Sequence, residues 1–405
     1  MSRGAVSSGM RGVALCVASC GWFACASRAD TATETAAITQ GSSAQDPAVV
    51  AIIAGDGTLG CSGTLIAPHT VLTAGHCIPA LRRRELSVFF GDSLSGAGTF
   101  VAVSDTRVHP QFDPATLAHD NALFTLREIG PVPALSLDPR TFDASLVGQT
   151  FRIVGFGVSA PDAGDTGDKR SGTATVSALD PVDLTAVGAP SLPCRGDSGG
   201  PALFDDGSGE RIGAVVSRGD PGCVQAGVFA RIDVVRDTFI APYLAETAPG
   251  TAATGDPCFY DGHCAEGTCR QAADDPLLYF CTRPCNHDDN CPAAMTCASG
   301  ECRHPLPSPG ALGSSCAGAD ACTSDDCYRP DGSGGTCTRS CFGKPDSCPA
   351  SFDCVAIETF MDDCLPRSGG CGCTAGARGG WMLPVGVLVA LRRRRRQRRL
   401  LGRRR

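Results

Sequence analysis

The chain has 405 residues, of which 42% are hydrophobic and 19% are charged, and its formal net charge is −7. At about 100–200 residues per domain, this length predicts two to four domains. The hydrophobic share excludes a wholly disordered chain, and the lack of an apolar run of about 18 residues excludes a polytopic membrane protein. Twenty-five cysteines argue against a reducing cytosol, where disulfides seldom persist.

Residues 1–26 have the pattern of an export signal. Arg3 and Arg11 precede the apolar run 13–18, as the charged and hydrophobic regions of a signal peptide do. Two processing sites remain open. Val17-Ala18-Ser19-Cys20 resembles a bacterial lipoprotein box with Cys20 as the lipidated residue, and Ala24-Cys25-Ala26 resembles an ordinary cleavage site. We expect residues 27–37, which are rich in Ala and Thr, to be a pro-segment.

Residues 38–247 contain short apolar runs separated by Gly, Pro, Asp and Ser, which predicts the strands of an all-β domain. Examples are residues 49–54, 86–90, 151–154 and 212–216. Residues 231–246 instead repeat apolar side chains at helical spacing, which predicts one helix that packs on the body of the domain.

Three motifs in this domain carry the chemistry. They are Leu-Thr-Ala-Gly-His-Cys ending at Cys77, His-Asp-Asn-Ala-Leu starting at His119, and Gly-Asp-Ser-Gly-Gly-Pro starting at Gly196. In the order His76, Asp120, Ser198 they resemble the chymotrypsin/trypsin-like serine proteases. The order differs from that of subtilisins and α/β-hydrolases. The resemblance implies two Greek-key antiparallel β-barrels followed by a C-terminal helix.

The resemblance also implies the catalytic roles. Ser198 needs a base because a hydroxyl is a weak nucleophile, and His76 can accept and return a proton near neutral pH. Asp120 would hold the other ring nitrogen of His76. The backbone N–H groups of Gly196 and Ser198 would stabilise the oxyanion.

Other family positions are matched as well. The resemblance implies the disulfides Cys61–Cys77 and Cys194–Cys223, and a hydrogen bond from Ser217 to the triad aspartate. Ile38 matches the mature N-terminus, whose ammonium would pair with Asp197 after activation. Ala37 precedes it, so an activator that cleaves after Arg or Lys is not expected.

The specificity pocket is expected to be apolar. Leu192 stands where trypsin-like members have an Asp at the pocket floor, and Ser217, Gly219 and Gly227 match the pocket walls. A buried unpaired cation is costly, so we expect cleavage after medium or large apolar residues. Arg218 departs from the aromatic residue that is frequent in the family. No cofactor and no metal is predicted, since the acidic pairs at 288–289 and 325–326 lack the spacing of an EF-hand.

A linker at 248–256 precedes two cysteine-rich repeats at 257–303 and 315–366, which a second linker at 304–314 separates. Each repeat has eight cysteines, both begin with Cys-x5-Cys-x4-Cys, and the offset is 58 residues. We expect two small modules of four disulfides each, with 105 pairings open per module. Cross-links must hold them because their apolar content is low. Zinc binding is the weaker alternative, since close C-x2-C pairs are missing.

Residues 367–405 form a tail with Cys371 and Cys373, an apolar stretch at 381–391 and an arginine cluster from 392 onward. This order resembles the C-terminal sorting tails of myxobacterial surface proteins. The apolar stretch is shorter than the roughly 20 residues that span a bilayer. A nucleic-acid-binding basic tail is the alternative. Loss of residues 1–37 and 374–405 would remove 14 basic and 2 acidic residues and leave a charge near −19.

The sequence therefore predicts an exported serine endopeptidase that acts on proteins or peptides, either secreted or displayed on the cell surface at the outer membrane. The tail or an N-terminal lipid would associate it with the membrane, and we expect no nucleic-acid partner. The competing hypothesis is a catalytically inactive surface protein that binds a partner through its cysteine-rich modules.

Overall fold

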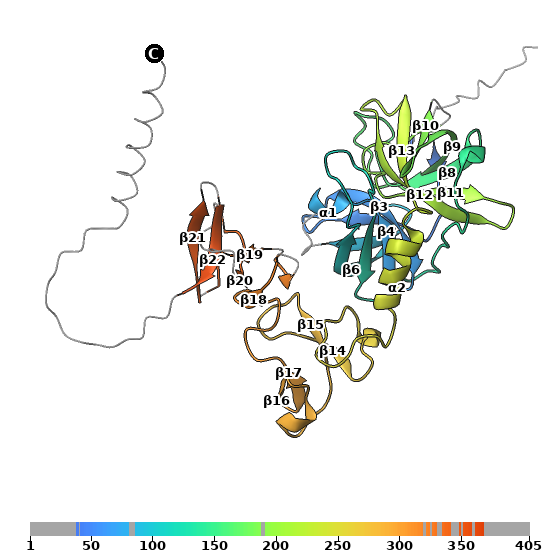
Figure 1. Cartoon of the computed structure of the whole chain (residues 1–405). Coiled ribbons are helices and arrows are strands. Elements are labelled where there is room, and N and C mark those ends of the chain that lie inside the picture. The colour runs from blue at the N-terminus through green and yellow to red at the C-terminus, as the bar shows by residue number, and fades with distance from the viewer. Residues whose placement is uncertain are drawn as a thin grey trace, which may run out of the picture. The chain divides into compact units, whose positions relative to one another are not determined.

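A computed structural model of the chain is shown in Figure 1. It describes residues 38–39, 41–80, 86–187, 191–318, 321–324, 326–329, 334–341, 348–349, 351–358 and 361–367. The export signal with Cys20, the pro-segment, and the tail beyond residue 367 with Cys371 and Cys373 lie outside these residues. In the described part, no helix is long and apolar enough to cross a membrane. The chain divides into two units, one up to Ser308 and one from Pro309.

The first barrel is closed and has six antiparallel strands in the order β2-β3-β4-β7-β6-β5. Its strands are β2 (Val49–Ile53), β3 (Leu59–Ala67), β4 (Thr70–Thr73), β5 (Ser87–Gly91), β6 (Gly98–Val108) and β7 (Ala122–Leu126). Strands β2, β4 and β7 are buried along their whole length, because one face lines the barrel core and the other is covered by the rest of the domain.

The second barrel repeats this topology, with the order β8-β9-β10-β13-β12-β11 closed by pairing between β8 and β11. Its strands are β8 (Thr150–Gly155), β9 (Arg170–Leu179), β10 (Asp183–Val187), β11 (Pro201–Asp205), β12 (Glu210–Gly219) and β13 (Ala226–Arg231), and β1 (Ser42–Ser43) pairs outside on β9. In both barrels the last three strands return in reverse order beside the first three. The expected all-β fold with two Greek-key barrels is confirmed.

The C-terminal helix is shorter than expected. Residue 231 ends strand β13, where it pairs with Ala214, and its guanidinium binds Asp233 at 2.7 Å. Strand pairing and this ion pair fix Arg231 in the sheet, so the helix starts only at Arg236. It begins as the π-helical turn η3 (Arg236–Ile240) and continues as α2 (Ala241–Glu246).

Ion pairs and a buried lysine join the two barrels. The Lys169 side chain, just before β9, is fully buried, and its Nζ donates to the Asp46 carbonyl at 2.7 Å and to Asp92 Oδ1 at 3.1 Å, both in the first-barrel region. Arg152 on β8 binds both carboxylate oxygens of Asp46 at 2.6 and 2.8 Å. Desolvation lowers the pKa of Lys169. Buried charges of this kind are stable only when they are paired, so the two barrels are held in one relative position.

The first cysteine-rich module packs on the two barrels within the same unit. Tyr260 stacks on His69, from the turn between β3 and β4, with ring centroids 3.6 Å apart, and its hydroxyl donates to the Thr247 carbonyl at 2.7 Å. The Arg127 guanidinium lies 3.6 Å from the centre of the Tyr279 ring. Residues 248–256, expected as a linker, bond instead to the module: Ala252 is buried and donates to the His263 carbonyl.

The sixteen module cysteines form four consecutive groups of four, here called four-cysteine units, and each unit has the same disulfide pattern. In each unit the first cysteine bonds to the third and the second to the fourth, and the last two face each other across a hairpin. The bridges are 258–269 and 264–281, 285–297 and 291–302, 316–327 and 322–337, and 341–354 and 348–364. The hairpins are β14 (Thr268–Gln271) with β15 (Tyr279–Thr282), β16 (Thr296–Ala298) with β17 (Glu301–Arg303), β19 (Cys327–Tyr328) with β20 (Gly335–Cys337), and β21 (Phe352–Glu358) with β22 (Met361–Pro366). The pairing that the sequence left open is thus the same in both modules. All these thiols are oxidised, so a zinc site would lack its thiolate ligands.

Candidate active site

His76 lies between strand β4 and the short helix α1 (Cys77–Ala80), next to a disulfide. Cys77 bonds to Cys61 on β3, as expected. The bridge therefore fixes the residue after His76 to the neighbouring strand of the first barrel. A disulfide that closes a loop of about this length stabilises a fold by roughly 3 kcal/mol.

His76 and Asp120 are in direct contact. The Asp120 Oδ2 lies 2.7 Å from His76 Nδ1, and Asp120 Oδ1 accepts the backbone N–H of His76 at 2.8 Å. Asp120 is fully buried, whereas about a quarter of the His76 side chain is exposed. One carboxylate thus orients both the ring and the backbone of the histidine, which leaves Nε2 on the exposed side of the ring.

A β-bulge brings Ser217 to the same carboxylate. In the pairing of β12 with β13, Val216 faces Phe229 and Arg218 faces Val228, so Ser217 is the extra residue. A bulge re-aims the side chain that it inserts. Ser217 Oγ donates to Asp120 Oδ2 at 2.6 Å, as the sequence predicted.

Ser198 lies on a tight loop tied to the strand that precedes His76. The Ser198 carbonyl accepts the N–H of Ser62 at 2.8 Å, and the Ser62 carbonyl accepts the Thr73 hydroxyl at 2.8 Å. Gly199, with φ of +83°, allows this approach, because a Cβ there would overlap the Thr73 side chain. Gly196 also has a positive φ, +97°, in the turn before Ser198. Glycine adopts this conformation at little cost.

Ile38 and Asp197 are already in contact in the uncut chain, whereas the sequence led us to expect their pairing only after cleavage. Ile38 is 1% exposed and Asp197 is fully buried. The Asp197 carboxylate accepts the N–H groups of Gly157 at 2.8 Å and Cys194 at 2.9 Å, and the Ile38 N–H is a third donor. Burial nevertheless raises the pKa of Asp197 to about 7, because neutral donors only partly replace the lost hydration.

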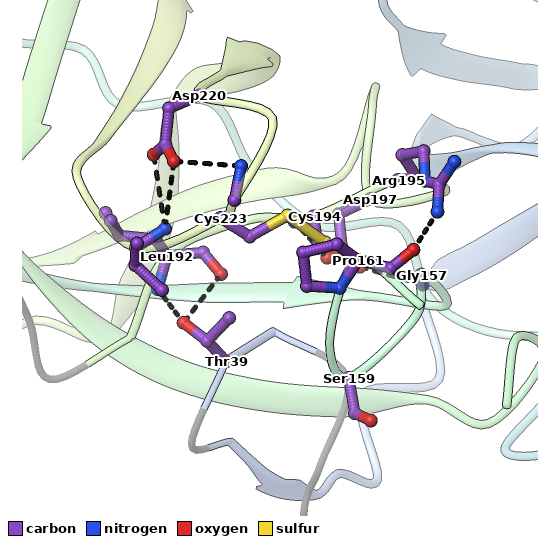
Figure 2. The surroundings of a disulfide bond; sticks show 12 residues. Thr39, Gly157, Ser159, Pro161, Leu192, Cys194, Arg195, Asp197, Asp220 and Cys223 are labelled. Carbon is purple, nitrogen blue, oxygen red and sulfur yellow. Dashed lines mark hydrogen bonds between the residues drawn. A yellow bond between two sulfur atoms is a disulfide. The ribbon is translucent and has the colours of Figure 1, made fainter. Parts of the chain in front are cut away.

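A cleft opens beside Ser198, and Figure 2 shows the disulfide in its wall. The residues that line it are Pro161, Asp162, Pro193, Cys194, Arg195, Ser198, Val216, Ser217, Arg218, Gly219, Asp220, Pro221 and Cys223. The bridge Cys194–Cys223 forms as expected. The cleft thus includes Ser217 and Gly219 of the expected pocket.

Leu192 and Gly227 lie elsewhere than in this lining. Leu192 is buried in the core of the second barrel with Ile38. Its backbone is held by Thr39, whose hydroxyl oxygen accepts the Leu192 N–H at 3.0 Å (Figure 2) and whose N–H donates to the Leu192 carbonyl at 3.1 Å. Pro193 covers Gly227, since a Cβ on Gly227 would lie 2.7 Å from Pro193 Cδ. Pro193 therefore stands in the cleft where the sequence pointed to its neighbour Leu192.

Two charged residues of the site were not predicted. Arg195 lines the cleft next to the oxyanion turn and donates to the Pro161 carbonyl. Asp183, on β10, binds the Arg218 guanidinium at 2.7 Å. The sequence noted Arg218 as unusual but gave no signal for its partner, because 35 residues separate the two and only the barrel brings them together.

The comparisons with known proteins agree with this geometry. The Trypsin family profile matches residues 37–239. The chain is 28% identical over 214 residues to a trypsin of Saccharopolyspora erythraea, a match that covers 48% of this chain and 91% of that protein. It is 30% identical over 203 residues to trypsin 5G1 of Aedes aegypti, covering 44% of this chain and 73% of that protein.

A third relative is longer. Bovine coagulation factor XII is 28% identical over 239 residues, and the chain spans 36% of its length. The matched residues 37–239 contain both barrels and the cleft and make up half of the chain. The chain therefore belongs to the trypsin family of serine endopeptidases.

Proposed function

We propose that the protein is an active protease with Ser198 as nucleophile, His76 as general base and acid, and Asp120 as the orienting carboxylate. One observation carries the proposal. The buried Asp120 receives three hydrogen-bonding groups, namely the His76 ring, the His76 N–H and the Ser217 hydroxyl. A buried carboxylate that is fully used in this way fixes the tautomer of the histidine and stabilises the imidazolium that forms during catalysis.

The reaction follows from these roles. Ser198 Oγ attacks the carbonyl carbon of the scissile peptide while His76 Nε2 takes the hydroxyl proton. The N–H groups of Gly196 and Ser198 stabilise the negative oxygen of the tetrahedral intermediate. The C–N bond then breaks, and His76 gives its proton to the leaving amine. Water repeats the sequence on the acyl-enzyme and releases Ser198.

Cleavage after medium or large apolar residues is the proposed specificity. Pro193, Val216 and the bridge Cys194–Cys223 give the cleft an apolar wall beside Ser198. Pro193 stands in the lining near the position expected for the pocket floor, and a cationic side chain would find no partner on this apolar wall. The acid of the opposite wall, Asp220, is occupied by backbone N–H groups.

Activation by cleavage between Ala37 and Ile38 is part of the proposal. The new ammonium of Ile38 would take the place of the amide that now faces Asp197, and a cation beside this buried carboxylate stabilises its charged form. Ordering of the loop 194–198 follows, because Asp197 also holds the Cys194 N–H within it.

Export through residues 1–26 and surface display through residues 367–405 complete the proposal, with the modules as a spacer or as a site for a surface partner. The alternative is an inactive protein that binds through the modules. Mass spectrometry of the mature protein would test the termini. A start at Ile38 and an end near Cys373 support processing at both ends, and an uncleaved chain on cells that show protease activity contradicts the proposed processing.

A fluorophosphonate reagent tests the catalytic proposal, because it labels a serine only when that serine is activated as a nucleophile. We expect labelling of the processed protein at Ser198, and loss of labelling in Ser198→Ala and His76→Ala. Ser95→Ala, which changes an exposed serine away from the cleft, is the matched control and should keep full labelling. A folded, processed protein without labelling would favour the binding alternative.

A further inference from the structure

The charged side chains that line the cleft differ in whether they are free to bind a substrate. Its described lining contains Arg195, Arg218, Asp162 and Asp220. Figure 2 shows that Asp220 is already occupied. Its carboxylate accepts the N–H groups of four residues in the loop behind it, namely Gly222, Val224, Gln225 and Ala226. Hydrogen bonds from this loop also lower the pKa of Asp220, so the carboxylate stays ionised while its oxygens are taken up by the loop.

Arg218, in contrast, is held in place but only partly used. Its Nη2 donates to Asp183 Oδ2 at 2.7 Å, and its Nη1 lies 3.5 Å from the Leu117 carbonyl and from Ser217 Oγ. The Asp183 side chain is 4% exposed, whereas the Arg218 side chain is 36% exposed. The buried Asp183 carboxylate therefore holds the Arg218 guanidinium in place, while part of the guanidinium remains exposed in the cleft.

An anchored guanidinium is well suited to recognise a carboxylate. It has five N–H donors in a rigid plane, of which a single strong bond goes to Asp183. Its side-chain entropy is already lost in the free protein, so a ligand does not have to order it. Arg218 also lies next to Ser217 and Gly219 in the lining that includes Ser198. A peptide bound at Ser198 would pass close to it.

Arg195 is a second guanidinium in the lining that includes Ser198. It is exposed, three residues before the nucleophile, and its guanidinium donates to the Pro161 carbonyl at the cleft rim (Figure 2). A neutral carbonyl leaves the charge of Arg195 unpaired. Asp162 and Asp220 also line the cleft, so the two arginines balance these carboxylates and do not make the whole lining positive.

We propose that Arg218, fixed by Asp183, is a specificity-determining residue that selects substrates with an acidic side chain near the scissile bond. The inference rests on the proposed function, since it concerns the peptide that the protease cleaves. The apolar wall at Pro193 and Val216 takes the residue before the scissile bond, and Arg218 takes a Glu or Asp at one neighbouring position. Arg195 contributes through its charge alone.

Fluorogenic peptides test the proposal with the processed full-length enzyme. Each peptide has an apolar residue before the scissile bond, and Glu, Gln or Lys is placed in turn at each flanking position. We expect kcat/KM for Glu to exceed that for Gln by about fivefold at one position, the size typical of a half-exposed ion pair, with Lys cleaved more slowly than Gln. The preference should fall as salt is raised.

Three variants connect the preference to Arg218. Arg218→Gln should bring the ratio of Glu to Gln close to one. Because that change leaves Asp183 buried without its cation, the double variant Asp183→Asn with Arg218→Gln serves as the second test, and we expect the same ratio there. Arg140→Gln changes an arginine that pairs with Asp138 away from the cleft, and it should retain the full preference.

Labelling of Ser198 by the fluorophosphonate distinguishes a failure of the inference about Arg218 from a failure of the proposed protease function. An enzyme that is labelled and cleaves apolar peptides, but shows equal rates for Glu and Gln at every position, overturns the inference and leaves the proposed function intact. A Glu preference that persists in both Arg218 variants also overturns it. An absence of labelling and of cleavage overturns the proposed function and the inference together.

Discussion

Asp197 shows how one buried carboxyl group can couple folding to activation. Its three partners in the uncut chain are backbone N–H groups, and none of them carries a full charge. Burial therefore raises the pKa of the carboxyl to about 7 from 3.8. In the folded precursor Asp197 keeps its proton over a pH range in which the unfolded chain has lost it.

The precursor should thus lose stability as the pH rises from about 4 to 7. The folded-state pKa lies above the unfolded one, so the stabilisation is complete at low pH and is lost as the pH approaches the folded value. The loss due to this group is about 4 kcal/mol. Urea unfolding of the uncut Ser198→Ala chain at each pH measures it, and adding Asp197→Asn should flatten the curve by that amount. An equal pH dependence with and without Asp197→Asn would contradict the assignment.

At this scale the sequence singled out the proposed catalytic residues and Ser217, but it missed other residues that hold the site. His76, Asp120 and Ser198 lie in contiguous motifs whose neighbouring residues identify them, and Ser217 was found by matching a family position. Asp183 and Arg195 lie in no motif, since their roles come from positions across the barrel. Leu192 was assigned by counting along the loop, which cannot tell which of two adjacent side chains turns inward.

At the scale of elements, the hairpin is the repeating unit of the C-terminal region. Each of the four units has two cysteines facing each other across a hairpin, yet both bond to cysteines that precede the hairpin. The sequence was interpreted as two repeats of eight cysteines. The first two cysteine spacings of each unit indicate a shorter repeat of four cysteines, but the variable hairpin length obscures it. The pairing among eight cysteines cannot be deduced from spacing.

The first of these units also supports the protease. Tyr260, 4% exposed, stacks on His69 and bonds to Thr247 just beyond helix α2. We expect Tyr260→Ala to lower the free energy of unfolding of the protease domain by about 3 kcal/mol, as for other buried aromatic residues. Loss of fluorophosphonate labelling with rising denaturant measures this. Tyr328→Ala, in the unit from Pro309 onward, is the matched control, and an equal effect of both changes would argue against a specific contact.

At the scale of the molecule, catalysis depends on how two barrels are joined. His76 and Asp120 belong to the first barrel, whereas Ser198 and Ser217 belong to the second. Strand patterns in the sequence predicted an all-β domain, and the resemblance carried by the three motifs implied the two barrels. It did not predict the ion pairs between them, since Asp46, Lys169 and Arg152 acquire their meaning only when the barrels are in contact.

A substitution of Lys169 tests the importance of the contact between the two barrels. Lys169→Met keeps most of the side-chain volume but leaves the Asp46 carbonyl without its donor. We expect a loss of about 2 kcal/mol in the free energy of unfolding, the usual penalty for an unsatisfied buried acceptor, and a fall in kcat, because the two halves of the site are less well aligned. Asp237→Asn, which breaks an exposed pair with Arg236, should change neither quantity. An unchanged kcat would show that the alignment does not depend on this residue.

The burial of Lys169 has a practical consequence for chemical labelling. The whole chain contains two lysines, and Lys169 is the one in the barrels. Its amine is enclosed in the folded protein, and it becomes accessible to a reagent only when the contact between the two barrels opens. An amine-acylating dye would therefore react with the barrels only in molecules whose two halves have separated. The native protein thus has a built-in chemical reporter for the opening of its active site, with no need for an engineered label.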